Sequence, residues 1–475
     1  MTRIFTFLLA SMLSGYCVAA PPPNILFIAI DDLRPSLGCY GDSIAKTPNI
    51  DAIARRGVRF EKAYCQQSVC AVSRLSLLTG QRPDTIEVWD LSTSFRKKFP
   101  DLVTLPQLFK QNGYYTRSVG KVFHGSGPAS LDPPSWTAPP ILDGRAKKRY
   151  VKQKIGNQKL KQASYESVAV EDTDYTDGLV TAAAVKILKS PLFKESPFFL
   201  AVGFRKPHLP FNAPKKYWDL YDRSQFKPPS NQLPLKAPEI ATRSWLELEG
   251  YQDIPKNLQK DPLNEEKIKL LHHGYYACIS YIDHQIGQIL RELKEQALCN
   301  NTIIVVWSDH GYHLGEQGLW TKGNNYELST RVPLIISDPR MESQGAASQS
   351  IVELLDIYPT LVELGNLNSN QNIQGASLVP LLQDPSTLRN TMALSQWPRD
   401  RFKNRHRGHG DIMGYSLRTK RYRYIEWRDW KSSKPLKREL YDHQKDPEEM
   451  LNIANEAGNT QLIISLRAKL NKKLN

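Results

Sequence analysis

Two continuously apolar stretches of the sequence each end in acidic residues. The first leads into Asp31 and Asp32, and the second leads into Asp309, which His310 follows. Adjacent carboxylates repel each other unless a cation lies between them, and Ca²⁺ and Mg²⁺ take oxygen ligands of this kind. A solvated turn would explain an isolated Asp-Asp pair better, but the second acid at an equivalent place changes the balance. The pattern therefore predicts a divalent cation held by these four residues, with the three acids as the firmer ligands.

Cys70 begins the segment Cys-Ala-Val-Ser-Arg, which ends at Arg74. If this segment is helical, the two side chains share one face and the guanidinium lies close to whatever residue 70 carries. The helix N-terminus would add a favourable potential for an anion. On residue types alone, a buried structural cysteine with Arg74 in an ion pair is the better interpretation.

The cysteine count also bears on Cys70. The sequence has six cysteines, of which Cys17 lies in the N-terminal segment. An odd number then remains, which in an exported chain indicates one thiol with a separate role. The other four either form two disulfides or stay reduced in the core.

Residues 1–20 are typical of a cleaved secretory signal, with a positive start, a short apolar run and small residues before Pro21. The apolar run is too short to span a bilayer, and no later segment is long and apolar enough. We therefore expect export to the periplasm or the medium, with no membrane anchor. A formal charge of +15 favours polyanionic partners. Nucleic acid is disfavoured because zinc-finger spacing and an RNA-binding aromatic signature are both missing.

The apolar pattern predicts the elements that must position these residues. Buried strands are expected over residues 24–30, 198–203, 302–308 and 332–336, and helices over 48–56, 177–189 and 264–296. Strands that alternate with helices predict an α/β fold with a mostly parallel sheet covered on both faces. In such sheets, ligands bind beyond the carboxyl ends of the strands.

Beyond about residue 391 the pattern changes to short strands. They are expected over residues 392–396, 415–419 and 422–427, before a final helix over 460–474. These elements indicate a smaller C-terminal α+β subdomain. The predicted division is a signal peptide at 1–20, a catalytic domain at 21–388 and the subdomain at 389–475.

Motifs along nearly the whole chain resemble those of the type I, formylglycine-dependent sulfatases. The segment from Cys70 to Arg74, with Leu-Thr-Gly at 78–80, is similar to the sulfatase signature Cys-x-Pro-Ser-Arg. Further similar segments are Asn24 to Asp32, Thr47 to Asp51, Gly120 to His124, Lys206 to His208 and Ser308 to Gly311. Within the family, residues 119–124, 199–211 and 413–418 look most like the iduronate-2-sulfatase branch.

This resemblance implies an alkaline-phosphatase-like core that hydrolyses O-sulfate esters on a sulfated oligosaccharide or polysaccharide. The branch suggests a 2-sulfated uronic acid, with algal or host polysaccharides as alternatives. The resemblance further implies that the formylglycine-generating machinery converts Cys70 into formylglycine. One hydroxyl of the hydrated aldehyde attacks sulfur, and the other then expels sulfate. One divalent cation, with Ca²⁺ favoured over Mg²⁺, polarises the sulfate.

The resemblance also implies roles for single residues. The cation ligands match Asp31, Asp32, Asp309, His310 and the modified Cys70. Basic residues that hold the hydrate or clamp sulfate oxygens match Arg74, Lys121 and Lys322. Two histidines match proton-transfer positions: His124 takes the proton during collapse of the hemiacetal, and His208 protonates the leaving alkoxide.

Val72 departs from the family pattern, because the signature usually has Pro at this position. The generating machinery reads the segment while it is extended, so a Val here would weaken conversion. The main alternative function is a phosphodiester or phosphonate monoester hydrolase on the same scaffold. A catalytically inactive polysaccharide-binding protein is the other alternative, and the complete set of acids, histidines and lysines argues against it.

Overall fold

The computed structural model describes residues 21–125, 131–141, 150–152, 162–243, 245–389, 392–400 and 408–474. The predicted signal peptide at 1–20 lies outside the described residues. Among the described helices, none combines the length and the apolar composition needed to cross a membrane. The four cysteines other than Cys17 and Cys70, namely Cys39, Cys65, Cys278 and Cys299, are free thiols.

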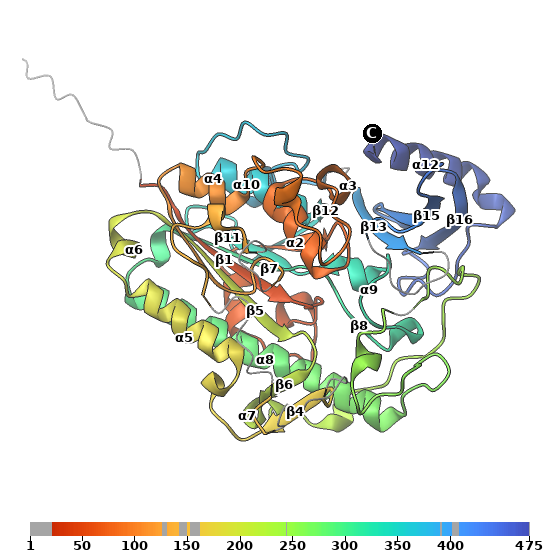
Figure 1. Cartoon of the computed structure of the whole chain (residues 1–475), viewed down its shortest axis with the longest axis horizontal. Coiled ribbons are helices and arrows are strands. Elements are labelled where there is room, and N and C mark those ends of the chain that lie inside the picture. The colour runs from red at the N-terminus through yellow and green to blue at the C-terminus, as the bar shows by residue number, and fades with distance from the viewer. Residues whose placement is uncertain are drawn as a thin grey trace, which may run out of the picture.

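An eight-stranded sheet forms the centre of the molecule (Figure 1), in the order β10-β2-β11-β7-β1-β5-β3 with β12 beside β2. Its strands are β1 (Asn24–Asp31), β2 (Val58–Tyr64), β3 (Tyr115–Gly120), β5 (Phe198–Pro207), β7 (Thr302–Ser308), β10 (Arg331–Val332), β11 (Leu334–Ser337) and β12 (Ala346–Glu353). Strands β3, β5, β1 and β7 run parallel, whereas β11 is antiparallel to both of its neighbours. The predicted mostly parallel sheet is therefore confirmed.

Strand β1 shows why this sheet lies between two helical layers. All eight of its residues are buried, and alternate side chains enter different cores because successive side chains point to opposite faces. Ile25 and Phe27 pack in one core with residues of α2 (Cys70–Thr79), α4 (Leu105–Gln111) and α10 (Ile357–Leu364). Leu26 and Ile28 pack in the other with residues of α1 (Pro48–Ala54), α5 (Thr176–Leu188) and α8 (Glu265–Glu295). A strand buried on both faces reads as one apolar run, which is why the sequence predicts it well.

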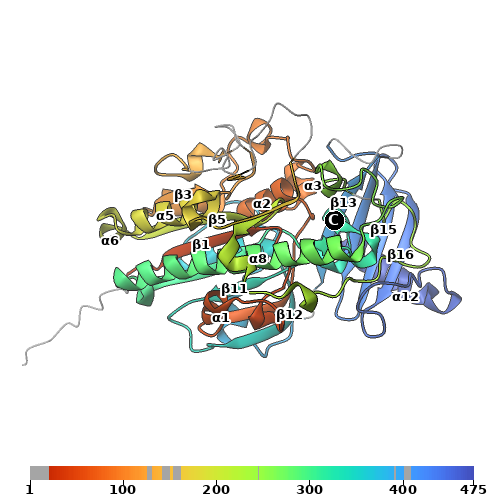
Figure 2. The same ribbon diagram turned by 90° about the horizontal axis from the view of Figure 1, so that it is seen from below.

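The helices of the two layers are α1 (Pro48–Ala54), α5 (Thr176–Leu188) and α8 (Glu265–Glu295) on one face, and α2 (Cys70–Thr79), α4 (Leu105–Gln111), α10 (Ile357–Leu364) and α11 (Val379–Gln383) on the other. Helix α8 runs the length of its layer beside the sheet (Figure 2). Short helices complete the chain: α3 (Pro83–Ile86), α6 (Leu192–Glu195), α7 (Lys215–Trp218) and α9 (Glu327–Thr330). Short strand pairs are β4 (Tyr165–Val168) with β6 (Phe211–Pro214), and β8 (His313–Leu314) with β9 (Trp320–Thr321).

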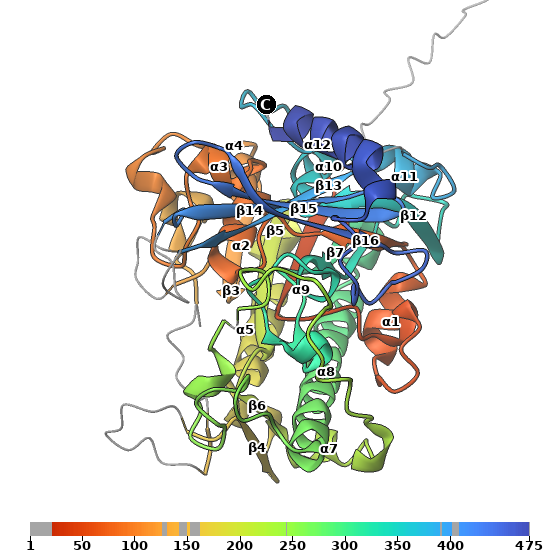
Figure 3. The ribbon, with the colours of Figure 1, turned by 90° about the vertical axis from the view of Figure 1, so that its right-hand side faces the viewer.

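A separate four-stranded antiparallel sheet follows near the C-terminus, in the order β13-β14-β15-β16. Its strands are β13 (Ala393–Arg399), β14 (Ile412–Arg418), β15 (Tyr422–Asp429) and β16 (Pro435–Asp442). Helix α12 (Thr460–Leu474) covers one face of this sheet (Figure 3) and buries Leu466 and Leu470 against it. The final helix agrees with its predicted bounds, whereas β16 and the edge strand β12 had no counterpart in the sequence prediction.

Candidate active site

The carboxyl ends of four parallel strands bring the predicted site residues together. Asp31 ends β1, Asp309 follows β7, Lys121 follows β3, and His208 follows β5. The register pairs Asp31 with Pro207, so the ends of β1 and β5 lie side by side. Three acids, Asp31, Asp32 and Asp309, are completely buried there. Asp32 adopts a left-handed backbone with φ of 62°, a conformation that non-glycine residues seldom adopt and that is concentrated at functional sites.

Helix α2 begins at Cys70 itself, so the segment from Cys70 to Arg74 is helical, which the sequence alone left open. Its N-cap, Val69, has no side-chain acceptor, so the usual capping signal is missing. This start places Cys70 in the first turn of the helix, where backbone N–H groups have no intrahelical acceptors. Ser73, one turn on, donates its hydroxyl to the carbonyl of Asp309 at 2.5 Å and fixes the helix against the end of β7.

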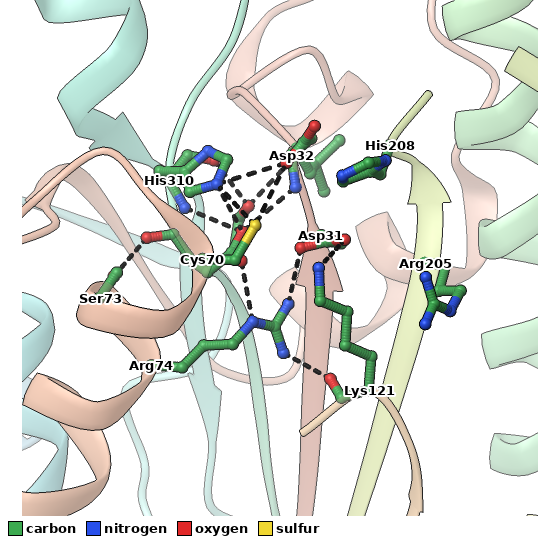
Figure 4. A network of polar contacts seen from close by, with 12 residues as sticks. Asp31, Asp32, Cys70, Ser73, Arg74, Lys121, Arg205, His208 and His310 are labelled. Atoms are coloured by element: carbon green, nitrogen blue, oxygen red, sulfur yellow. Dashed lines mark hydrogen bonds and ion pairs between the residues drawn. The ribbon is translucent and has the colours of Figure 1, made fainter. Parts of the chain in front are cut away.

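Arg74 binds two of the three acids and lies below them in the view of Figure 4. Its Nε donates to Oδ2 of Asp309 at 2.8 Å, and its Nη2 donates to Oδ1 of Asp31 at 3.1 Å. Its Nη1 donates to the carbonyls of Lys121 and Val122. The guanidinium is fully buried, and every one of its nitrogens has an acceptor, which is what a buried cation requires.

The Cys70 thiol lies among the metal-ligating candidates. Its Sγ is 3.3 Å from Nε2 of His310, 4.0 Å from Oδ1 of Asp32 and 3.8 Å from Nζ of Lys322. One ligand atom from each of Asp31, Cys70, Asp309 and His310 lies within 4.8 Å of the others. His310 donates from Nδ1 to the carbonyl of Gly311 at 2.9 Å, so Nε2 carries the lone pair that faces Cys70. Burial lowers the pKa of His310 to about 4, which keeps this nitrogen free of a proton at neutral pH.

Two lysines neutralise Asp31, the last residue of β1, and Asp32, which follows it. Lys121 Nζ lies 2.5 Å from Oδ2 of Asp31, and Lys322 Nζ lies 2.7 and 2.8 Å from the two oxygens of Asp32. Lys121 reaches this place because the backbone passes very close to β5: a Cβ on Gly120 would come within 2.1 Å of the carbonyl oxygen of Gly203. Gly120 also has φ of +77°, which glycine adopts at no steric cost.

The two predicted histidines differ in their surroundings. His208 donates from Nδ1 to the carbonyl of Leu209 at 2.7 Å, and its Nε2 lies 3.2 Å from Oε1 of Glu247. His124 buries its Nδ1 with no hydrogen-bond partner among the described residues. Burial, and then the charge of Lys121, lowers the pKa of His124 to about 3. A neutral imidazole with an unused buried nitrogen is suited to accept a proton.

The electrostatics argue against an unmodified thiol as the reactive group. Burial, and then the negative charge of Asp31, raises the pKa of the Cys70 thiol well above its usual range. A thiol becomes a nucleophile only as the thiolate, so Cys70 as such stays protonated and inert at neutral pH.

Comparison with known proteins identifies the family. The family model described as sulfatase matches residues 23–367, and iduronate 2-sulfatase of Mus musculus is 34% identical over 94% of this chain and 93% of its own length. The chain belongs to the sulfatase family. This sulfatase is therefore a hydrolase of sulfuric esters. Its C-terminal part, residues 315–475, also matches the family model described as N-sulphoglucosamine sulphohydrolase, C-terminal.

Solved structures share the fold of this sulfatase. A protein in complex with its substrate D-glucosamine-2-N,6-O-disulfate has a TM-score of 0.75 at 24% identity, covering 95% of this chain and 97% of that one. The phosphonate monoester hydrolase of Agrobacterium radiobacter has a TM-score of 0.78 at 21% identity, covering 95% of each chain. Both likenesses concern the fold, an α/β core with the mixed sheet described above.

Sequence reasoning missed one residue at the site of this sulfatase. Glu247 faces His208 through Oε1 and lies 3.1 Å from Nζ of Lys322 through Oε2. It comes from a Pro-rich irregular stretch, just before a short 3₁₀ turn at Leu248–Gly250. No motif surrounds it, and only the folded chain brings it to the site.

Proposed function

We propose that this sulfatase removes O-sulfate groups from sulfated carbohydrates, with 2-sulfated uronic acids as the first candidates. The observation that carries the proposal is the position of Cys70 at the N-terminus of α2, 3.3 Å from His310 and 3.8 Å from Lys322. A relative named iduronate 2-sulfatase and a structural neighbour bound to a disulfated glucosamine support a sugar substrate. The net charge of +15 suits an anionic polysaccharide.

The donor set fits a hard divalent cation. Asp31, Asp32, Asp309 and His310 offer three carboxylates and an unprotonated nitrogen around residue 70. Burial raises the pKa of Asp32 well above its usual range, with Lys322 opposing this rise and Asp31 adding to it. A bound cation would favour the ionised form of this carboxyl group. We infer Ca²⁺ rather than Mg²⁺, because Ca²⁺ accepts irregular sets of oxygen ligands whereas Mg²⁺ requires a near-octahedral one. When bound, the cation polarises the sulfate group.

Conversion of Cys70 to formylglycine by the generating machinery is the second part of the proposal. It is supported by the chemistry of the site, in which the thiol itself stays protonated. The hydrated aldehyde supplies a hydroxyl nucleophile at this position. Arg74 and Lys121 hold Asp31 from two sides, and Lys322 and Lys121 present positive charge to the oxygens of the sulfate. Preorganised charge of this kind is often the largest catalytic contribution.

Two histidines manage the protons. Both ring nitrogens of His208 face acceptors, Leu209 O and Glu247 Oε1. Burial lowers the pKa of His208 and Glu247 opposes this fall, so Glu247 favours the protonated ring that donates to the leaving alkoxide. His124 is neutral with an unused buried nitrogen, which suits a proton acceptor. The two side chains therefore divide the roles of general acid and general base.

We also propose that residues 1–20 direct export of the protein to the periplasm or medium. Residues 21–388 then form the catalytic domain, and 389–475 form a companion subdomain. The sequence of residues 1–20 supports export, with its positive start and short apolar run.

The test is turnover of defined sulfated oligosaccharides, compared with phosphodiester and phosphonate monoester analogues, by protein whose residue 70 has been examined by peptide mass spectrometry. We expect inorganic sulfate to be released from sugar sulfates and Cys70→Ala to abolish that release. Faster cleavage of the phosphorus esters would overturn the sulfatase substrate assignment. An unmodified thiol in fully active protein would overturn the role of formylglycine.

A further inference from the structure

A polar pocket separate from the active site lies between the edge of the main sheet and the C-terminal sheet. Its volume is about 640 Å³, and an adjoining pocket of about 660 Å³ shares Lys62, Gln349 and Lys420 with it. We call the two together the β12 pocket, because residues of the edge strand β12 line both. None of the ten residues assigned to the active site lines it.

Positive charge dominates the lining of the β12 pocket. Among the described residues of the lining, two acids, Glu61 and Glu327, face six basic residues: Lys62, Arg331, Arg389, Arg418, Lys420 and Arg421. Both acids are already engaged by cations. Glu327 accepts from Arg423 at 2.5 Å and from Arg418 at 3.1 Å, and Glu61 accepts from Arg59 at 2.7 Å.

Lys62 and Lys420 supply charge that the protein itself does not neutralise. Among the described residues, neither ammonium group has a carboxylate in ion-pair contact, whereas Arg421 pairs with Asp442 at 2.6 Å. Lys62 is half-buried, and burial, followed by the charges of Arg418 and Arg331, lowers the pKa of its ammonium group. An anion bound in the pocket would offset the repulsion among these cations and favour the charged form of Lys62.

The neutral part of the lining suits a carbohydrate. The register of β12 against β2 shifts between Ser348 and Ile351, and such bulges redirect side chains. The shifted residues Gln349 and Ser350 line the pocket, with Ser386 and Gln444 elsewhere in its wall. These side chains can hydrogen-bond to hydroxyl groups. The lining that the structure describes includes no Phe, Tyr or Trp, although stacking on such rings supports much of single-stranded nucleic-acid binding.

We propose that the β12 pocket is an anion-binding exosite that holds sulfate or carboxylate groups of a sulfated polysaccharide, away from the residue being desulfated. This inference rests on the proposed carbohydrate substrate. It explains why the pocket combines unneutralised lysines with neutral hydrogen-bonding side chains. An exosite of this kind raises the affinity for long chains without new contacts at the active site, because a second attachment acts at high effective concentration.

The experiment compares the double variant K62Q/K420Q with the wild type and with K186Q/K194Q, which removes the same charge from exposed positions on α5 and α6. Binding of a heparin dodecasaccharide is measured by titration calorimetry at several salt concentrations. We expect K62Q/K420Q to bind the dodecasaccharide about tenfold more weakly and with a shallower salt dependence, because the variant neutralises two fewer of its anionic groups. The affinity of K186Q/K194Q for the dodecasaccharide should equal that of the wild type. Turnover of a sulfated disaccharide by K62Q/K420Q should also be unchanged.

Equal affinity of wild type and K62Q/K420Q for the dodecasaccharide, or an equal loss in K186Q/K194Q, would overturn the exosite. Binding of a poly(U) RNA of matched charge, with the same dependence on Lys62 and Lys420, would also overturn its assignment to polysaccharide. The exposed variant K420Q alone, checked by its melting temperature, guards against misfolding of the half-buried Lys62 substitution. If no sulfated sugar is turned over but heparin binding still depends on the two lysines, the proposed function fails and the exosite stands.

Discussion

Glu247 Oε1 lies 3.2 Å from Nε2 of His208, and Glu247 Oε2 lies 3.1 Å from Nζ of Lys322. One carboxylate thus stabilises the protonated forms of two side chains of the proposed active site. Burial, and then the charge of Lys322, lowers the pKa of His208 well below its usual range, whereas Glu247 opposes this fall. Glu247 is therefore a positioning residue that helps His208 to keep its proton.

Substitution of Glu247 by Gln should impair the protonation of poor leaving groups. Without the carboxylate charge the pKa of His208 falls further, so the alkaline limb of the pH–rate profile moves to lower pH. We expect kcat/KM for a sugar sulfate to fall by about 100-fold, with a much smaller loss for an aryl sulfate, whose leaving group needs no proton. Glu239→Gln, at a position with 87% side-chain exposure, is the control. Equal losses for both substrates would show that Glu247 has no part in proton transfer.

Replacement of Val72 by Pro should raise the fraction of protein carrying formylglycine. Proline restores the residue that the signature usually has, and the folded helix tolerates it. Val72 lies in the first turn of α2, and the first intrahelical bond runs from the N–H of Ser73 to the carbonyl of Val69. The N–H of Val72 therefore has no intrahelical acceptor to lose.

The measurement for Val72→Pro is the ratio of aldehyde to thiol in the peptide that contains residue 70. Activity per protein molecule should rise in proportion to this ratio. The control is Ala71→Pro, which places a proline in the same helical turn at a position next to Val72. A lower aldehyde fraction in Val72→Pro than in the wild type would contradict the expectation.

The sequence predicted those site residues that lie at the carboxyl ends of strands. Apolar runs before Asp31 and Asp309 mark strands buried on both faces, and parallel strands present their carboxyl ends at one edge. Glu247 could not be predicted, because its contact with His208 arises from the path of an irregular stretch through space. The start of α2 at Cys70 carries no capping signal in the sequence, because Val69 offers no capping side chain.

Edge strands were also difficult to predict. The first half of β16 is largely exposed, and β12 begins with a polar, partly exposed segment. Neither strand therefore shows the apolar run that marks β1. The β12 pocket could not be predicted from the sequence either, because Lys62 and Lys420 line the same pocket only when β2 and the turn after β14 are packed together.

Removal of the divalent cation by a chelator should both abolish activity and lower the melting temperature. Asp31, Asp32 and Asp309 are buried together, and a ligand that binds only the folded state adds about 2.7 kcal/mol at 100 times its dissociation constant. Added Ca²⁺ should restore both quantities. The variant Asp32→Asn should lose the response of its melting temperature to chelator, which is a readout independent of catalysis. An unchanged melting temperature of chelated wild-type protein would contradict a resident cation.

The Arg34–Glu316 ion pair should make stability depend on pH. Nη1 of Arg34 lies 2.6 Å from Oε1 of Glu316, and although burial opposes ionisation, Arg34 brings the pKa of Glu316 from 4.5 to about 2. A pKa that is lower in the folded state contributes stability that is present above the unfolded value and is lost as the pH falls through the folded value. Glu316→Gln should therefore cost about 1–3 kcal/mol at pH 7, and this difference should shrink below about pH 4.5. Urea unfolding over a pH series measures it, with Glu265→Gln at an exposed position of α8 as the control. A difference that stays constant from pH 7 to pH 3 would assign the loss to packing rather than to the charge of Glu316.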